Sequence, residues 1–184
     1  MVAVAAMYDR FKLLLAEAAV LARLRGPFLA ALGADDLDLA RKALSSHPGC
    51  ASRALTETLD SLPRGPQAAA EHLAAALCDE RRLLDRRFLI LGTLGNNAPF
   101  IGLFGTVLGV IKAFHDLGQS GAGPEVVMAG LSEALVATAV GLLVALPCVV
   151  AFNNLQKRVR DLIGETEALG LRLGASARAE EKRR

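Results

Sequence analysis

The stretch LSEALVATAVGLLVALPCVVAFNNLQKRV, residues 131–159, decides the fold of this chain. Apolar residues run almost without interruption from Val126 to Phe152, and Glu133 is the only charged side chain among them. A transmembrane helix needs about 20 consecutive apolar residues, so this stretch is long enough to cross a membrane. A second apolar stretch comes shortly before it. The sequence therefore predicts an all-α integral membrane protein with two long transmembrane helices, at about 98–115 and 126–152.

The overall composition agrees with a membrane protein. Hydrophobic residues make up 53% of the 184 residues and the mean hydropathy is +0.38, which is too apolar for an ordinary soluble domain. Charges avoid the apolar region: from residue 88 to residue 156 the charged side chains are only Lys112, Asp116, Glu125 and Glu133. Basic residues do not form a stripe with interleaved aromatic residues, so nucleic-acid binding is disfavoured.

No motif for covalent catalysis stands out. The three cysteines are far apart and in no CxxC spacing, so neither a disulfide framework nor a zinc site is expected. We find no nucleophile and base pair, no phosphate loop and no spacing of metal ligands. The sequence therefore predicts no enzyme, no cofactor and no metal, and a soluble helical enzyme is the weakest of the alternatives.

The chain divides into three regions. Residues 1–92 are predicted to form an N-terminal helical cytosolic region, residues 93–159 the transmembrane core, and residues 160–184 a C-terminal cytosolic helix and tail. Within the first region, we expect a helix over Phe11–Leu24 that ends or is interrupted at Gly26-Pro27. A longer helix should start at Pro66 and lead directly toward the membrane.

The flanking charges predict the orientation of the spans. Four arginines precede the first span and three basic residues follow the second, namely Arg81, Arg82, Arg86, Arg87, Lys157, Arg158 and Arg160. Because cytoplasmic flanks carry an excess of Lys and Arg, both ends are expected inside and Leu117–Glu125 outside. The first span should begin at Ala98-Pro99, with Asn96 or Asn97 as its cap.

Small residues recur at four-residue steps in both spans. In a bilayer, close helix contact depends on such residues, because the hydrophobic effect does not drive it. The predicted packing residues are Gly105, Gly109 and Ala113 in the first span and Ala137, Gly141 and Ala145 in the second. Pro147 in the second span permits a helix kink.

Glu133 is the candidate functional residue of the second span. A carboxylate inside a span costs about 2.5–3.5 kcal/mol, so such residues usually line an ion path or have a partner. Counting along the two helices places Thr106 and Thr138 at similar depth, where their hydroxyls could extend a polar path. In the alternative reading, each threonine bonds to its own helix and Glu133 is solvated near the interface. Lys112, His115 and Asp116 are interpreted as a solvated interfacial cluster.

The segments NNAPFIGLFGTVLGVIKAF and LSEALVATAVGLLVALPCVVAFNNLQKRV resemble the two pore-lining helices of the MotA/TolQ/ExbB proton-channel family, closest to its TolQ and ExbB branch. Thr106 in GLFGTVLG matches the pore threonine of that family. Glu133 in SEAL and Thr138 in VATA match its acidic and hydroxyl positions. The resemblance implies a proton pathway over Thr106, Glu133 and Thr138 in an energy-transducing bacterial inner-membrane complex driven by the proton motive force.

The same resemblance implies partners. It implies a homo-oligomeric ring, a pentamer, around an ExbD- or TolR-like single-span protein that carries an essential Asp, and further a TonB- or TolA-like protein. The complex would serve biopolymer uptake or envelope maintenance. The chain departs from the family pattern in two places: the first membrane helix of the family is missing or truncated, and Asn96-Asn97 replaces small residues before the Ala-Pro. A non-conducting membrane scaffold, assembled through the small-residue faces, is the alternative function.

Overall fold

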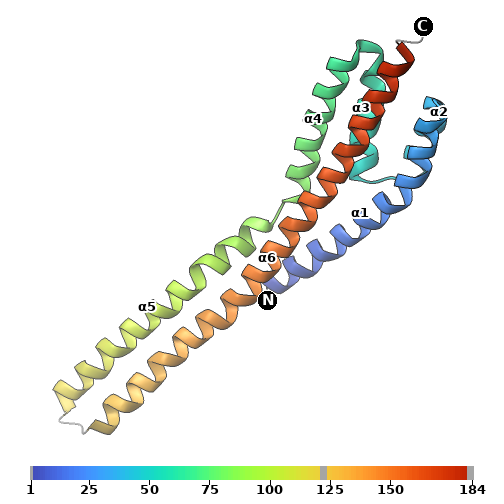
Figure 1. Cartoon of the computed structure of the whole chain (residues 1–184). Coiled ribbons are helices and arrows are strands. Elements are labelled where there is room, and N and C mark those ends of the chain that lie inside the picture. The colour runs from blue at the N-terminus through green and yellow to red at the C-terminus, as the bar shows by residue number, and fades with distance from the viewer. Residues whose placement is uncertain (1, 121–123, 182–184) are drawn as a thin grey trace. The chain divides into compact units, whose positions relative to one another are not determined.

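The computed structural model describes residues 2–120 and 124–181, and every regular element in these ranges is helical. The elements are α1 (Val2–Gly33), α2 (Leu37–Ser46), α3 (Cys50–Ser61), the 3-10 turn η1 (Leu62–Arg64), α4 (Pro66–Leu84), α5 (Phe88–Ser120) and α6 (Pro124–Glu181), as Figure 1 shows. The prediction of an all-α fold with two long apolar helices is confirmed. Residues 121–123 of the predicted outer loop and residues 182–184 of the predicted tail lie outside the described residues.

The chain folds into two compact units. One contains Met1–Met7 and Arg87–Asn154, and the other contains Tyr8–Arg86 and Leu155–Arg184. Helix α6 contributes to both units, because it continues without a break from Pro124 to Glu181. The part of the predicted C-terminal region that the structure describes, residues 160–181, is helical and belongs to α6.

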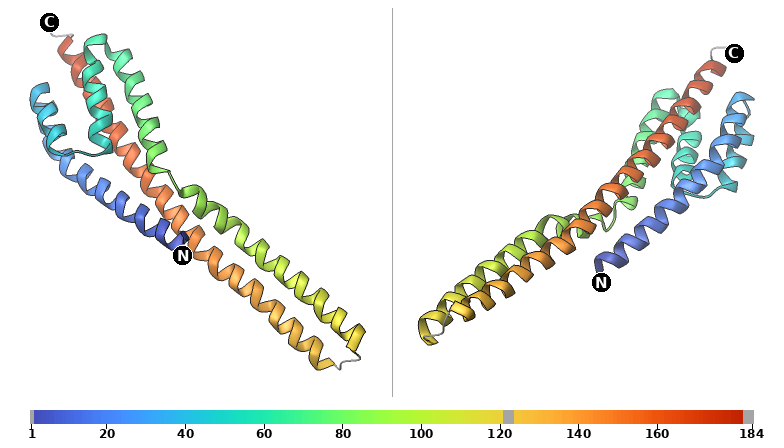
Figure 2. Two further views of the ribbon diagram at one scale, coloured as in Figure 1. Left: turned by 180° about the vertical axis from the view of Figure 1, so that it is seen from behind. Right: turned by 60° about the horizontal axis from the view of Figure 1, so that its bottom comes forward.

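The first unit is a helical hairpin. Helix α5 and the first part of α6 lie side by side in opposite directions, as Figures 1 and 2 both show. Both helices are long and apolar enough to cross a membrane. Only 11% of the most apolar part of α5 and 17% of that of α6 is buried, whereas the core helix of a soluble protein would be mostly buried. Their outward side chains are large and apolar, among them Phe100, Ile101, Phe104, Ile111, Leu135, Leu143 and Leu146.

Helix α5 begins earlier than the sequence predicted. It starts at Phe88, and Asn97 is no cap, since its side-chain amide donates to the carbonyl of Thr93 within the helix at 2.8 Å. The residues before Pro99 already pack against α6: a Cβ built at Gly95 would lie 2.8 Å from a methyl of Val149. This packing offsets the one backbone donor that Pro99 lacks, so the helix passes through the proline.

Two further helix ends differ from the prediction. Helix α1 continues through Gly26-Pro27 to Gly33, because Leu24 and Phe28 on either side of the proline are fully buried and hold the helix to the core. Helix α4 does not continue into the membrane span. It stops at Leu84, and Arg87 has a positive φ of 73° before α5 begins. A backbone conformation that an α-helix does not allow therefore separates the two helices.

The second unit has its own core. The apolar faces of α3 and α4 meet at Ala54, Leu73, Ala76 and Leu77, and Ile163 of α6 packs against this cluster. Helix α6 approaches α4 closely, because a Cβ at Gly170 would lie 2.5 Å from a methyl of Leu73. The sequence expectation of a small helical module before the spans agrees with this arrangement.

Polar contacts join the helices of the second unit. The carboxylate of Glu17 on α1 accepts the backbone N–H of Cys50 at 2.8 Å and so caps the first turn of α3. The guanidinium of Arg53 donates to both carboxylate oxygens of Glu80, at 2.6 Å each, and links α3 to α4. The guanidinium of Arg158 on α6 lies 4.8 Å from the ring centre of Phe11 on α1.

The three cysteines differ in their environment, which gives a direct test of the fold. Cys50 and Cys148 are buried and Cys78 is exposed. Burial, together with the nearby Glu17 carboxylate, raises the pKa of the Cys50 thiol to about 12, so at neutral pH it is not a thiolate. We expect N-ethylmaleimide to modify Cys78 alone in the folded protein and all three cysteines after denaturation, as measured by mass spectrometry.

The variant Cys78→Ser is the matched control, because it should remove the label of the folded protein while leaving two sites in the denatured chain. Modification of Cys50 at a rate similar to that of Cys78 would contradict the burial of α3 against α1.

Candidate functional site

Glycines and alanines form the contact between α5 and α6. A Cβ built at Gly105 would lie 2.7 Å from the Cβ of Ala137, and one at Gly109 would lie 2.5 Å from the Cβ of Ala134. At Gly141 a Cβ would come within 2.7 Å of the backbone oxygen of Ala98. No side chain larger than hydrogen fits at these glycines without moving the helices apart. Small residues therefore set the distance between α5 and α6.

The same contact continues along the whole hairpin. Toward the C-terminal end of α5, a Cβ at Gly130 would lie 2.8 Å from the Cβ of Ala113. Toward the other end, a Cβ at Gly92 would meet the ring of Phe152 at 3.2 Å. The ring of Phe152 also lies edge-on to that of Phe88, with centroids 6.3 Å apart and planes at 71°. These pairs fix one antiparallel register for the two helices.

The predicted packing residues lie along this contact. Gly105 and Gly109 face α6, Ala137 and Gly141 face α5, and Ala113 and Ala145 are 3% and 4% exposed. The contact also includes Gly102, Gly130 and Ala134, which the sequence did not predict. Strict four-residue steps leave these residues out, whereas a helix with 3.6 residues per turn keeps one face in steps of three and four. Ala134 and Ala137 are such a three-residue step.

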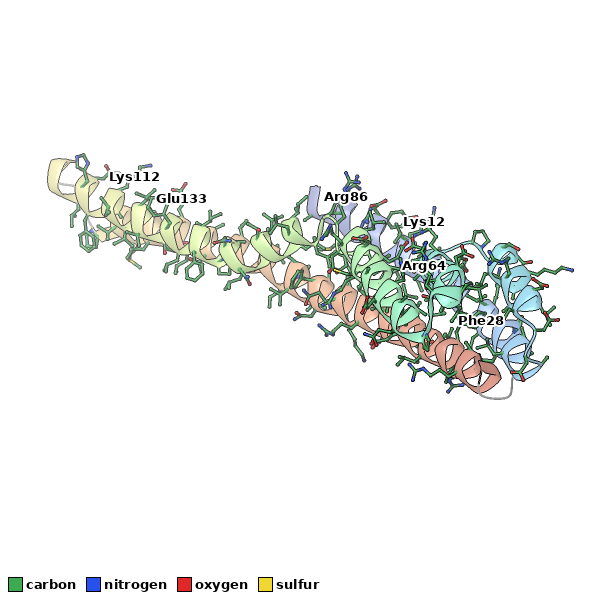
Figure 3. The ribbon with its side chains drawn as sticks, turned by 90° about the horizontal axis from the view of Figure 1, so that it is seen from above. Lys12, Phe28, Arg64, Arg86, Lys112 and Glu133 are labelled. Atoms are coloured by element: carbon green, nitrogen blue, oxygen red, sulfur yellow. The ribbon has the colours of Figure 1, made fainter. Side chains whose placement is uncertain are left out.

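A groove lies on one side of the α5–α6 contact, and Glu133 lines it. Its volume is about 630 Å³, and the helix α5 residues along it include Gly109, Lys112 and Asp116. Figure 3 shows Glu133 and Lys112 close to the same end of the hairpin and on the same side of it. The rest of the lining is small or apolar: Gly105, Leu108, Ala113, Val126, Ala129, Gly130, Ala134, Val136 and Ala137. Glu133 is therefore a carboxyl in largely apolar surroundings.

The charged neighbours of Glu133 are on the other helix. Lys112 and Asp116, which the sequence analysis assigned to a solvated interfacial cluster together with His115, line the groove with Glu133. The ring Nδ1 of His115 lies 3.5 Å from a carboxylate oxygen of Asp116. The sequence signal that could have placed Lys112 here is its position three residues after Gly109 on the contact face.

The two threonines make different interactions. The hydroxyl of Thr106 donates to the carbonyl of Leu103 in its own helix at 2.6 Å, which is the alternative reading of the sequence for this residue. The hydroxyl oxygen of Thr138 is buried and has no hydrogen-bond partner among the described residues. A buried hydroxyl without a partner is uncommon, so Thr138 retains the capacity to bind a polar group.

The register places both threonines at one level. Gly102 lies against Gly141 and Gly109 lies against Ala134, so Thr106 is level with Ala137 of the antiparallel helix, and Thr138 lies about one residue, or ~1.5 Å, from that level. Around α6, Thr138 is about 140° from Glu133, and the contact with α5 lies between the two. Neither threonine lines the groove. The structure therefore brings the two threonines together and separates them from Glu133.

The polar side chains of the hairpin can exchange protons and form hydrogen bonds. Glu133 can take up and release a proton, and Thr138 can donate or accept a hydrogen bond. Among residues 2–120 and 124–181, no group of three or more His, Cys, Asp or Glu side chains could hold a metal ion. Pro147 lies inside α6, and the helix continues on both sides of it.

Comparison with known proteins identifies relatives of this chain. The model of the MotA/TolQ/ExbB proton channel family matches residues 47–168. The chain is 38% identical over 136 residues to the biopolymer transport protein ExbB of Neisseria gonorrhoeae, an alignment that covers 71% of this chain and 60% of that protein. It is 41% identical over 87 residues to ExbB of Aquifex aeolicus, covering 47% of this chain and 59% of the relative.

A further relative is named for the Tol-Pal system. The chain is 38% identical over 96 residues to the Tol-Pal system protein TolQ of Pseudomonas aeruginosa, covering 52% of this chain and 42% of TolQ. In the two ExbB alignments the chain spans 59–60% of the relative's length, which is less than two thirds.

The glycine contact can be tested by adding one methyl group. Gly141→Ala should lower the midpoint of thermal unfolding in detergent, because the added Cβ meets the backbone of α5 and overpacking costs about 1–3 kcal/mol. Gly118→Ala is the control, since nothing lies within 4 Å of a Cβ there. The control should leave stability unchanged or raise it, because Ala favours a helix by about 1 kcal/mol over Gly. Equal effects of the two substitutions would contradict the contact.

Proposed function

This chain belongs to the MotA/TolQ/ExbB proton channel family, and from that membership we propose that it is a proton-channel subunit of an energy-transducing membrane complex. In this role the proton motive force acts through the α5–α6 hairpin on a partner protein. The relatives are named for biopolymer transport and for the Tol-Pal system, so transport or envelope maintenance is the process that the complex would power.

The position of Glu133 carries the proposal. It is the one charged side chain in the apolar stretch from Val126 to Phe152, and it lines a groove whose walls are mostly small and apolar. Apolar surroundings favour the neutral form of a carboxyl, and a nearby cation favours the ionised form. A carboxyl under both influences can exchange protons, which is what a relay in a membrane requires.

Thr106 and Thr138 would form a second polar position on the path. They lie at one level on the other side of the helix contact from Glu133, and the Thr138 hydroxyl has no partner among the described residues. A proton that passes from one side of the hairpin to the other needs a hydrogen-bonding group beyond Glu133, and the two hydroxyls supply it. In a ring of several copies, the two sides of each hairpin would face different neighbours.

The partners and the setting follow from the same proposal. The complex would be a homo-oligomeric ring, a pentamer, in the bacterial inner membrane with an ExbD- or TolR-like single-span protein and a TonB- or TolA-like protein. The helical unit of Tyr8–Arg86 and Leu155–Arg184 would lie in the cytoplasm, because Arg81, Arg82 and Lys157 flank the spans on that side.

Glu133→Gln tests the relay. The amide keeps the shape of the side chain but cannot bind and release a proton in the pH range in which a carboxyl does. We expect proton flux to fall at least about tenfold in liposomes that contain the full chain and an ExbD- or TolR-like single-span protein, with an imposed membrane potential and a pH-sensitive dye inside.

Glu125→Gln is the control, because Glu125 is a carboxylate in the first turn of α6 that does not line the groove. It should leave the flux close to that of the unmodified protein. Unchanged flux and unchanged partner-dependent transport in Glu133→Gln would overturn the relay and favour the alternative function, a membrane scaffold that does not conduct.

A further inference from the structure

The charges of the membrane hairpin are concentrated in one place. Between residues 88 and 156 the charged side chains number four, and three of them, Lys112, Asp116 and Glu133, line the groove beside the helix contact. The chain could carry these residues on any side of two long helices. Their convergence from both helices on one groove suggests that they act on one another.

The register brings Lys112 within reach of Glu133. Gly109 lies against Ala134, and Ala113 lies against Gly130. Along the hairpin, Lys112 therefore lies between these two contacts, and Glu133 lies next to the contact of Gly109 with Ala134. The two Cα atoms are therefore about two residues apart along the hairpin, or ~3 Å. The flexible four-carbon stem of a lysine can span such an offset. The glycines and alanines between them place no bulky side chain in the way.

Neither charge has a partner within the described part of the chain. The ammonium of Lys112 and the carboxylate of Glu133 form no ion pair or hydrogen bond there, whereas Asp116 lies 3.5 Å from the ring of His115. An unpaired charge of either sign is unfavourable inside a bilayer, so each of the two costs free energy on its own. Pairing the two offsets both costs at once.

We propose that Lys112 is the positioning residue for proton transfer at Glu133: its ammonium pairs with the ionised carboxylate and turns to Asp116 when Glu133 takes up a proton. The inference rests on the proposed function, because it assigns the counter-ion of the same relay. The proton comes from the outer aqueous side, and only the O–H bond of the carboxyl forms and breaks.

Asp116 is the second acceptor in this arrangement. It lies four residues after Lys112 on α5, so the two side chains are neighbours on one helix face. The titratable groups that face Lys112 are then Asp116 with its neighbour His115 on α5, and Glu133 on α6. With Glu133 ionised the three groove charges sum to −1, and with Glu133 protonated they sum to zero, which leaves Lys112 paired with Asp116.

Zero-length cross-linking tests the pair in the unmodified full chain. A membrane-permeable carbodiimide adds to a carboxyl to form an O-acylisourea. The amine of a lysine in direct contact, after giving up its proton, attacks the acyl carbon, so an amide forms and a urea is released. We expect mass spectrometry of the protein in liposomes at neutral pH to find an amide between Lys112 and Glu133. Glu125 is the internal control and should form no amide with Lys112. Cross-links of Lys112 to Asp116 alone would overturn the proposal.

The pH dependence of proton flux distinguishes pairing from a merely structural role. Lys112→Met removes the cation at similar length, so the pH of half-maximal flux should rise by about one unit, a tenfold change in proton concentration. Lys112→Arg keeps the cation and should keep the pH profile. A profile of Lys112→Met that coincides with that of the unmodified protein would overturn the proposal.

The two tests also separate this inference from the proposed function. Absence of flux in the unmodified complex would overturn proton conduction, while the cross-link would still decide whether Lys112 pairs with Glu133. Flux that depends on Glu133 together with no Lys112–Glu133 amide would leave the relay in place and remove Lys112 from it.

Discussion

The close approach of α5 to α6 is the constraint on which the hairpin depends. Glycine lies opposite alanine or glycine at successive levels, as at Gly102 with Gly141 and Gly109 with Ala134, and a single Cβ at any of these glycines would collide with the other helix. In a bilayer this contact must come from van der Waals packing, because lipid is as apolar as the side chains it would replace. The contact therefore fixes the distance between the helices and their register.

The register in turn decides where the polar groups lie. On one side of the contact, Glu133, Lys112 and Asp116 share a groove of about 630 Å³. On the other side, Thr106 and Thr138 lie at one level, and the Thr138 hydroxyl is buried without a partner among the described residues. A shift of either helix by one residue would turn its side chains by about 100° and would break this division. Packing and proton chemistry thus depend on the same small residues.

Much of this could be predicted from the sequence. Hydropathy located both spans, and counting along the two helices gave Thr106 and Thr138 a similar depth. The helix ends were not predictable, because Asn97 before Pro99 has the pattern of a helix start, yet packing of Gly95 against Val149 extends the helix past it. Pro27 likewise has the pattern of a helix end, and the buried Leu24 and Phe28 override it. Lys112 lies in the groove because of the register between α5 and α6. The sequence of either helix alone does not specify that register.

Disulfide cross-linking between the two helices measures the register most directly. In a chain whose three cysteines are replaced, the account predicts rapid intramolecular oxidation of the pair Thr106→Cys with Thr138→Cys, because both positions lie at one level on one side of the contact. The pair Thr106→Cys with Glu133→Cys should not oxidise, because its members lie on opposite sides. Equal cross-linking of the two pairs, or a preference for the second, would contradict the division of the hairpin into a carboxyl side and a threonine side.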